Sequence, residues 1–197
     1  RGRYSEAAST GNAGMIVPSH IVPLSAPGVI AKGLKWLMNP ESPLYIKPSA
    51  NPKFMKWLWL FQKHCNSDHV ARSVPVLRDL SLMSRDLFSD VCALPGFEEV
   101  GLAHEGLLML HRSESAKKDN LELADLAEEA GLEISRLNAS ETMELEPALK
   151  TELTGSVFFK QDASLHPERF MRALEAYLRE AGVDFLDAEV KSFERSA

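Results

Sequence analysis

The stretch Ser9-Thr-Gly-Asn-Ala-Gly-Met15 is the most distinctive part of this chain of 197 residues. Its small residues let the backbone approach a ligand closely, and its hydroxyl and amide groups can hydrogen-bond to phosphate oxygens or ring heteroatoms. A tight turn leading into a helix accounts for the same residues equally well. The composition of the stretch leaves both interpretations open.

The overall composition is that of an ordinary globular protein. Hydrophobic residues make up 45% and charged residues 25% of the chain, which excludes disordered and collagen-like sequences. At about 150 residues per domain the length corresponds to roughly 1.3 domains, so one large domain or two small interleaved domains both fit. The chain has 28 acidic and 22 basic residues and a net charge of −6. Without a long basic run, nucleic acid is not expected as a partner.

Sequence motifs of common catalytic and metal sites are absent. The chain contains no GxGxxG, GKS, GKT, GxSxG or HExxH. Cys65 and Cys92 are far apart and form no CxxC, so we expect neither a disulfide scaffold nor a metal site, and a cytoplasmic location fits. No signal peptide or spanning helix is expected. The chain starts at Arg1 and ends in an alternating pattern from Val190, so we expect an internal piece of a longer protein.

Helices dominate the first half of the predicted structure. Residues 54–61 and 74–91 carry apolar side chains at helical spacing, and Pro95-Gly96 ends the second pattern. A shorter helix is predicted over 29–37, and residues 1–28 are typical of a loop.

After residue 95 the hydrophobic period changes. Residues 100–103 and 106–111 predict the two strands of a hairpin. The later expected elements are a helix from Ser113 or Ser115 to Ala130, a strand over 133–137, a short helix from Ser140, a strand over 154–160, a helix from Pro167 to Gly182 and a strand over 183–186. This order favours an α/β fold with α+β character rather than a regular βαβ series.

Two histidines and one aromatic run have functional and structural interpretations. His20 follows the glycine-rich stretch in a proline-flanked loop, and either faces a ligand or lies on the surface. His166 precedes a helix, where the dipole favours anions, although an N-cap needs no further function. The run with Trp57 and Trp59 could lie in a membrane interface, but core packing or a subunit contact is the favoured interpretation, because the flanking lysines are few.

Several strings resemble, in order and spacing, the D-amino-acid dehydrogenase branch of the FAD-dependent amine oxidoreductases, the family that includes glycine oxidase and D-amino-acid oxidase. The strings are STGNAGMIVP at 9–18, PLSAPG at 23–28, LKWL at 34–37, EGLLML at 105–110, ELEPAL at 144–149, HPERF at 166–170 and Gly182-Val183. Together they extend over nearly the whole chain.

The resemblance implies parts of an FAD-binding domain interleaved with a mixed-sheet substrate-binding domain. Residues 1–95 would be flavin-side loops and helices, 96–165 the substrate-binding sheet and helix, and 166–197 a return to the flavin domain. The family's GxGxxG unit and its substrate-carboxylate arginine would lie outside these residues. The 197 residues alone are therefore not expected to bind the flavin or to be active.

The resemblance also implies a cofactor, a site and a reaction. The residues expected to line the FAD are Ser9, Thr10, Asn12, Ala13, Gly14 and Met15; those expected on the substrate side are His20, Met109 and His166. The reaction would be hydride transfer from the α-carbon of a D-amino acid to FAD, giving an imino acid that hydrolyses to a 2-oxo acid and ammonia. Alternatives are a glycine- or sarcosine-type oxidase using oxygen and a non-catalytic binding domain. The catalytic residues are not identified, and peripheral contact with the inner face of a membrane or with quinone is a further expectation.

Overall fold

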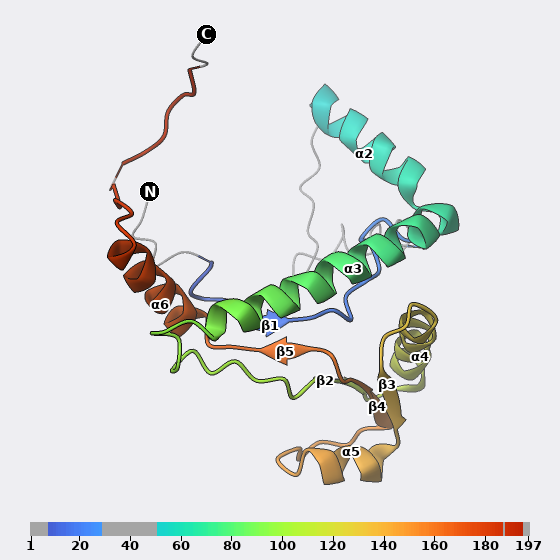
Figure 1. The fold of residues 1–197 in the computed structure, drawn as a ribbon. Helices are drawn as coiled ribbons and strands as arrows, with labels where there is room; N and C mark the ends of the chain where they lie inside the picture. The colour runs from blue at the N-terminus through green and yellow to red at the C-terminus, as the bar shows by residue number, and fades with distance from the viewer. Residues whose placement is uncertain (1–7, 29–50, 187, 195–197) are drawn as a thin grey trace.

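The structure is a computed structural model that describes residues 8–28, 51–186 and 188–194. The helix predicted over residues 29–37 lies outside the described residues. The long helix α3 (Ser67–Cys92) runs across the molecule, with α6 (Pro167–Glu180) near one end and α4 (Glu114–Glu129) near the other (Figure 1). Helix α2 (Pro52–His64) precedes α3, as the sequence predicts.

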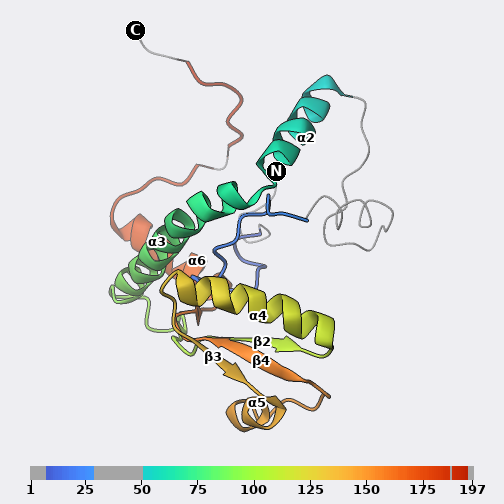
Figure 2. The same ribbon diagram turned by 90° about the vertical axis from the view of Figure 1, so that its right-hand side faces the viewer.

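A three-stranded antiparallel sheet forms the part of the molecule below α4. Its strand order is β2 (Leu107–His111), β4 (Gly155–Phe159) and β3 (Ile134–Leu137). Helix α4 covers one face of the sheet, and the short helix α5 (Ala139–Leu145) lies on the other face (Figure 2). The mixed content of helices and strands confirms the predicted fold class.

The alternation of side chains along the strands places the core between the sheet and α4. Val157 and Phe159 of β4 are almost fully buried on this face, and Leu107 and Met109 of β2 pack beside them. Ala124 and Ala127 of α4 close the core from above. The small side chains on α4 allow the helix to approach the sheet closely.

The predicted hairpin over residues 100–111 is wrong. Residues 100–103 form no strand, and β2 pairs with β4, about fifty positions further along the chain. Gly106 explains the difference, because its φ is +77° and a Cβ there would lie 2.5 Å from the Phe158 ring. The chain therefore changes direction at Gly106 and passes from one sheet to another.

A second, two-stranded sheet joins a segment near the start of the chain to a segment that follows β4. Strand β1 (Met15–Ile16) pairs antiparallel with β5 (Ala163–Ser164). Ala103 extends this sheet through two backbone hydrogen bonds with Ser164, of 2.8 and 2.9 Å. The small-residue stretch at residues 9–15 therefore leads into a strand that pairs with residues about 150 positions later.

The helix starts follow local capping rules. Ser113 caps α4 by accepting a hydrogen bond from the Ala116 N–H, as predicted, and Pro167 is the first residue of α6. Helix α5 begins one residue earlier than expected, at Ala139, because Asn138 and Glu141 form a capping box.

Helix α3 connects the other parts of the fold. Midway along α3, the Arg78 guanidinium donates a 2.6 Å hydrogen bond to the carbonyl of Ala130, at the end of α4. Near its end, the Phe88 ring lies 5.3 Å from the Phe170 ring of α6. The helix thus fixes α4 and α6 relative to each other.

The strand predicted over residues 183–186 is also wrong. These residues are extended and exposed, as are residues 188–194, where the alternating pattern continues. Leu186 is 85% exposed and Phe193 is 94% exposed. An alternating pattern forms a strand only when a partner pairs with its backbone groups, and no described strand does so here.

Candidate functional site

Asn12 closes the small-residue loop at residues 8–15 on itself. Its side-chain oxygen accepts a 2.7 Å hydrogen bond from the Gly14 N–H. Its amide nitrogen donates to the carbonyls of Ala8, at 2.9 Å, and Ser9, at 3.1 Å. Both polar atoms of Asn12 are therefore occupied in holding the shape of the loop.

Gly14 places the loop directly against the start of α6. Its φ is +65°, and a Cβ there would lie 1.9 Å from the Leu165 carbonyl oxygen and 3.0 Å from the Pro167 ring. The Gly14 carbonyl accepts a 2.9 Å hydrogen bond from the Leu165 N–H. Only glycine fits this close approach, which explains why the stretch needs a glycine here.

The opposite side of the loop is open. Ser9, Gly11, Ala13 and Met15 are exposed, and Thr10 is half-buried. Apart from Gly11 and its two chain neighbours, no atom of the described residues lies within 4 Å of the position that a Gly11 Cβ would take. The small residues on this side allow a flat group to approach the backbone closely, so the residues present fit a planar cofactor.

Met15 continues this open surface onto the small sheet. Its side chain shares one face with Ser164, which stands directly opposite on β5, and Ala103 pairs with Ser164 in turn. Ile16 and Ala163 are buried on the other face. Adjacent strands lie about 4.8 Å apart, so the surface from Met15 to Ala103 is about 10 Å wide.

His166 occupies the N-cap of α6, as the sequence predicts, but its side chain makes no capping hydrogen bond. The ring is exposed and packs over Gly101, where a Cβ would lie 2.7 Å from the ring Cδ2. Because Pro167 has no N–H, the partial positive charge at the start of α6 is carried by the next amides. This end of the helix favours a negatively charged group beside the loop.

Ser19 and Asp162 form a buried pair that sequence reasoning missed. Each is 1% exposed. The Ser19 N–H donates to Asp162 Oδ1 at 3.0 Å, and the Ser19 hydroxyl donates to Oδ2 at 2.6 Å. Burial raises the pKa of the Asp162 carboxyl, although the two hydrogen bonds and the nearby His20 and Arg85 oppose the shift. The feature of the sequence that could have indicated this pair is the position of Asp162, an acidic residue directly before the apolar Ala163 in a strand-like pattern.

His20 lies at the solvent side of this pair. Its Nδ1 is 3.3 Å from the Ser19 hydroxyl oxygen, and the residue is exposed. His20 thus lies beside Ser19, after β1, and His166 lies between Leu165 and Pro167, the two residues that contact Gly14.

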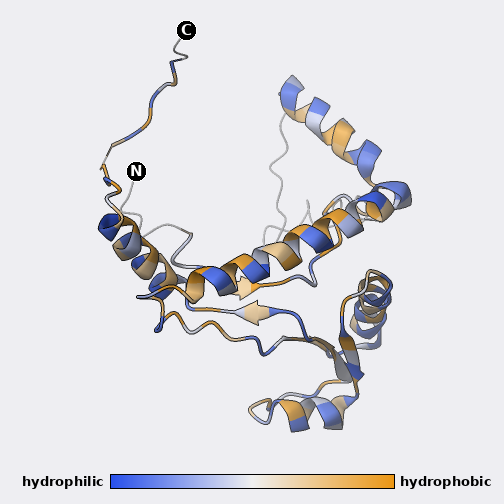
Figure 3. Cartoon of the chain, in the orientation of Figure 1, coloured by the Kyte–Doolittle hydropathy of each residue, from blue (hydrophilic) through white to orange (hydrophobic). Residues whose placement is uncertain are grey.

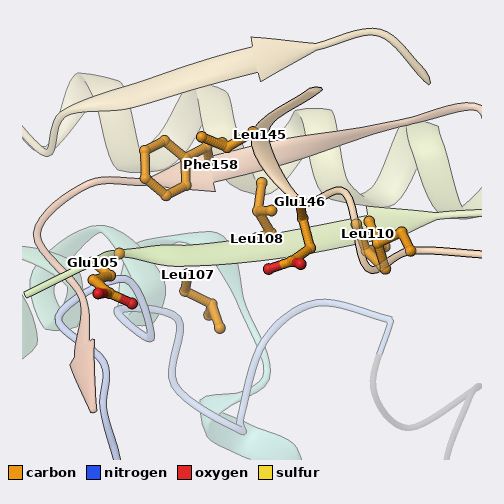
Figure 4. Close-up of a pocket in the computed structure, with 9 residues that line it drawn as sticks. Glu105, Leu107, Leu108, Leu110, Leu145, Glu146 and Phe158 are labelled. Carbon is orange, nitrogen blue, oxygen red and sulfur yellow. The ribbon is translucent and has the colours of Figure 1, made fainter. Parts of the chain in front are cut away.

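Met109 lies elsewhere. Its side chain faces α4 and packs against the core. Its neighbours on the opposite face of β2, Leu108 and Leu110, line a cavity of about 510 Å³, as do Glu146 and Phe158 (Figure 4). The structure thus separates Met109 from the loop and from the two histidines.

Metal and membrane features are absent from the described chain. Among residues 8–28, 51–186 and 188–194, no three His, Cys, Asp or Glu side chains gather as metal ligands would. Within the same ranges, no helix combines the length and the apolar character needed to cross a bilayer.

The sequence matches one protein family, described as FAD dependent oxidoreductase (DAO), over residues 1–197. The chain belongs to this family. The resemblance seen in the sequence is thereby confirmed, and so is FAD as the cofactor of the family.

Two glycine oxidases have similar structures. The glycine oxidase from Geobacillus kaustophilus matches with a TM-score of 0.57 and 19% identity, covering 90% of this chain and 35% of that one. The glycine oxidase from Bacillus cereus ATCC 14579 matches with a TM-score of 0.51 and 22% identity, covering 55% of this chain and 31% of that one. The chain thus spans about a third of the length of these enzymes. At this identity the likeness shows the shared fold.

Proposed function

We propose that this chain is the part of a flavin-dependent amino-acid oxidoreductase that holds one side of the FAD. The observation that carries the proposal is the loop at residues 8–15, which is open on one side and fixed on the other against the start of α6. Membership of the FAD dependent oxidoreductase family supports it. The glycine-rich nucleotide-binding unit and the rest of the substrate site would come from outside the 197 residues.

Each part of the loop has a physical role in this proposal. Ser9, Thr10, Ala13 and Met15 line the FAD, while Asn12 and Gly14 hold the backbone that supports them. The start of α6 favours negative charge on the bound group. The small side chains let a flat ring approach the backbone closely. Fixed dipoles near a flavin tune its chemistry.

The proposed domain division follows the connections between the two sheets. Residues 1–95 and 166–197 would belong to the flavin side, and 96–165 to the substrate side. In support, β2, β3 and β4 come from the middle range, while α6 comes from an outer range. The two sides meet where β1 of the first range pairs with β5, at the end of the middle range. The chain would cross between the two domains close to Ala103 and Asp162.

The proposed reaction is oxidation of a D-amino acid or a similar small amine. Bound FAD supplies a hydride acceptor for the α-carbon, and the resulting imino acid hydrolyses to a 2-oxo acid and ammonia. His20 and His166 lie near the loop and are proposed on the substrate side. Met109 is proposed to affect the substrate side only indirectly. Its side chain packs in the core, on the face of β2 opposite to Leu108 and Leu110, which line the cavity.

Substrate profiling of the full-length protein tests this function. The protein is mixed with an artificial dye acceptor and with D-amino acids, L-amino acids, glycine or sarcosine. Dye reduction with D-amino acids, together with equal amounts of ammonia and 2-oxo acid, is the expected result. Activity with glycine or sarcosine and oxygen would support the oxidase alternative. No turnover by a flavin-loaded protein would support the non-catalytic alternative.

Helix α2 favours a peripheral membrane contact as an additional proposal. Trp57 is 48% exposed and Trp59 is 59% exposed. The helix contains three lysines and no acidic residue, although the chain is acidic overall. Figure 3 shows hydrophobic and hydrophilic residues interleaved along α2. Exposed tryptophans beside lysines suit the interface of a bilayer that contains anionic lipids.

Liposome sedimentation tests this contact. The full-length protein is expected to sediment with anionic liposomes but not with neutral ones, and the variant with Trp57→Gln and Trp59→Gln is expected to stay in the supernatant. Met143→Gln, on the exposed side of α5, serves as the control. The membrane contact is contradicted if the wild-type protein stays in the supernatant with anionic liposomes. If it also produces one molecule of peroxide per molecule of substrate, oxygen is its electron acceptor.

A further inference from the structure

The short sheet that carries the loop is too small to hold itself in place. Strands β1 and β5 share only two residue pairs, Met15 with Ser164 and Ile16 with Ala163. Isolated short strand pairs are marginal in water. A slip of one residue would exchange the buried face, which holds Ile16, for the exposed face, which holds Met15. The register therefore depends on contacts outside the ladder.

Two contacts flank these pairs: one backbone hydrogen bond that continues the same register, and one side-chain contact outside the ladder. On one side the Leu165 N–H donates to the Gly14 carbonyl at 2.9 Å. On the other side Ser19 donates two hydrogen bonds to the Asp162 carboxylate. The two anchors lie at opposite ends of β1, so together they fix the position of the loop along β5.

The Asp162 anchor is the stronger and the more central of the two. Both oxygens of a buried carboxylate accept from one residue, and hydrogen bonds to a charged group are about twice as strong as neutral ones. The Asp162 carbonyl also accepts a 3.0 Å hydrogen bond from the Gly106 N–H, where the chain enters β2. Arg85 of α3 reaches the same turn through the Gln161 carbonyl, at 3.5 Å. Asp162 thus stands where both sheets and α3 meet.

We propose that Asp162 is a positioning residue for the cofactor: through Ser19, its carboxylate sets the register of β1 on β5 and holds the loop at residues 8–15 in the shape that binds FAD. This inference rests on the proposed function. Asp162 does not touch the cofactor. It acts through Ser19 and the backbone between Ser19 and Met15.

The test measures FAD affinity and local hydrogen exchange in the full-length protein. The variants are Ser19→Ala and Asp162→Asn, with Val157→Ala as a control for global stability and Asp79→Asn as a control for lost charge. Val157 is fully buried in the other sheet, and Asp79 is 65% exposed in a surface ion pair. All proteins are compared below their melting temperatures, after removal and titration of FAD.

Ser19→Ala and Asp162→Asn are expected to weaken FAD binding by about tenfold or more, which corresponds to the loss of one hydrogen bond to a charged group. The amides of residues 14–21 should exchange faster in the same two variants. Val157→Ala and Asp79→Asn should bind FAD as the wild type does. Affinity losses no larger than that of Val157→Ala would overturn the inference.

The outcomes separate this inference from the proposed function. A wild-type protein that binds no FAD contradicts the proposed function itself. A second outcome contradicts only the positioning role of Asp162. In that outcome the wild type binds FAD, a variant with a bulky residue in the loop does not, and Ser19→Ala and Asp162→Asn bind FAD as the wild type does.

Discussion

The carboxylate of Asp162 accepts two hydrogen bonds from Ser19, a residue 143 positions earlier in the chain. This pair joins the loop that follows β1 to the turn between β4 and β5. Because both residues are almost fully buried, the connection is protected from competing water. It gives the exposed loop at residues 8–15 a fixed position on an otherwise small sheet.

The burial of Asp162 predicts a pH dependence of stability. Its pKa is raised above the ordinary 3.8, so the folded protein binds this proton more tightly than the unfolded chain. The free energy of unfolding contributed by this group is therefore greatest below pH 3.8 and falls as the pH rises through the raised pKa. Asp162→Asn should remove this part of the pH profile in urea unfolding. Parallel profiles for the two proteins would contradict the assignment.

His111 predicts the opposite pH dependence. Its side chain is 2% exposed, and its Nδ1 has no hydrogen-bond partner among the described residues. Burial, and then the charge of Lys117, lower the pKa from 6.5, so its contribution to stability is present above pH 6.5 and lost as the pH falls through the lowered value.

Replacing His111 should therefore stabilise the protein. His111→Leu removes an unpartnered buried nitrogen, which is expected to add about 1 kcal/mol to the free energy of unfolding at pH 7. The difference in the free energy of unfolding between the variant and the wild type should be larger at pH 5. At that pH the wild type loses the stability that the lowered pKa of His111 contributes, and the variant has no such group. Urea unfolding at the two pH values measures both effects. A loss of stability at pH 7 would show that the ring makes a favourable contact.

The core under α4 predicts a large effect of truncation. Phe159 is 1% exposed, lies at the end of the central strand β4 and packs in the core under α4. Phe159→Ala should reduce the free energy of unfolding by about 3–5 kcal/mol. Phe193→Ala is the matched control, because Phe193 is 94% exposed and its loss should change stability by less than about 0.5 kcal/mol. Similar effects of both changes in chemical denaturation would argue against this core.

The two glycines of the loop should respond differently to a methyl group. Gly14→Ala places a Cβ 1.9 Å from the Leu165 carbonyl oxygen at a φ of +65°, and should cost more than about 1 kcal/mol. Gly11→Ala places a Cβ in open space and should cost far less. Thermal unfolding of the two variants measures the difference. Equal costs would mean that Gly14 does not pack against Leu165.

The helices could be predicted from the sequence because their signals are local. The apolar stripe of α3, the Ser113 cap of α4 and the Pro167 start of α6 each depend on residues within one or two turns. The strand pairing could not be predicted in the same way. Strand β2 is apolar enough to be predicted as a strand, but its partner β4 lies far along the chain. Gly106 turns β2 away from residues 100–103.

Only part of the candidate site could be predicted from the sequence. The loop at residues 8–15 stands out through its small residues, and its spacing to His166 belongs to the family resemblance. The Ser19–Asp162 pair has no local pattern, because it depends on two segments that meet only in the folded protein. Met109 shows the same limit: alternation places it on one of two faces, and the fold decides which face meets α4.

The most direct test of the account is the FAD content of a protein with a filled loop. Ala13 is exposed on the open side of the loop, so Ala13→Leu should leave the fold and its thermal stability intact. Ala71→Leu, on the exposed side of α3, is the matched control. After purification, the flavin absorbance per chain should be close to one FAD for the wild type and for Ala71→Leu, and close to zero for Ala13→Leu. Full flavin occupancy in folded Ala13→Leu would contradict the placement of FAD against this loop.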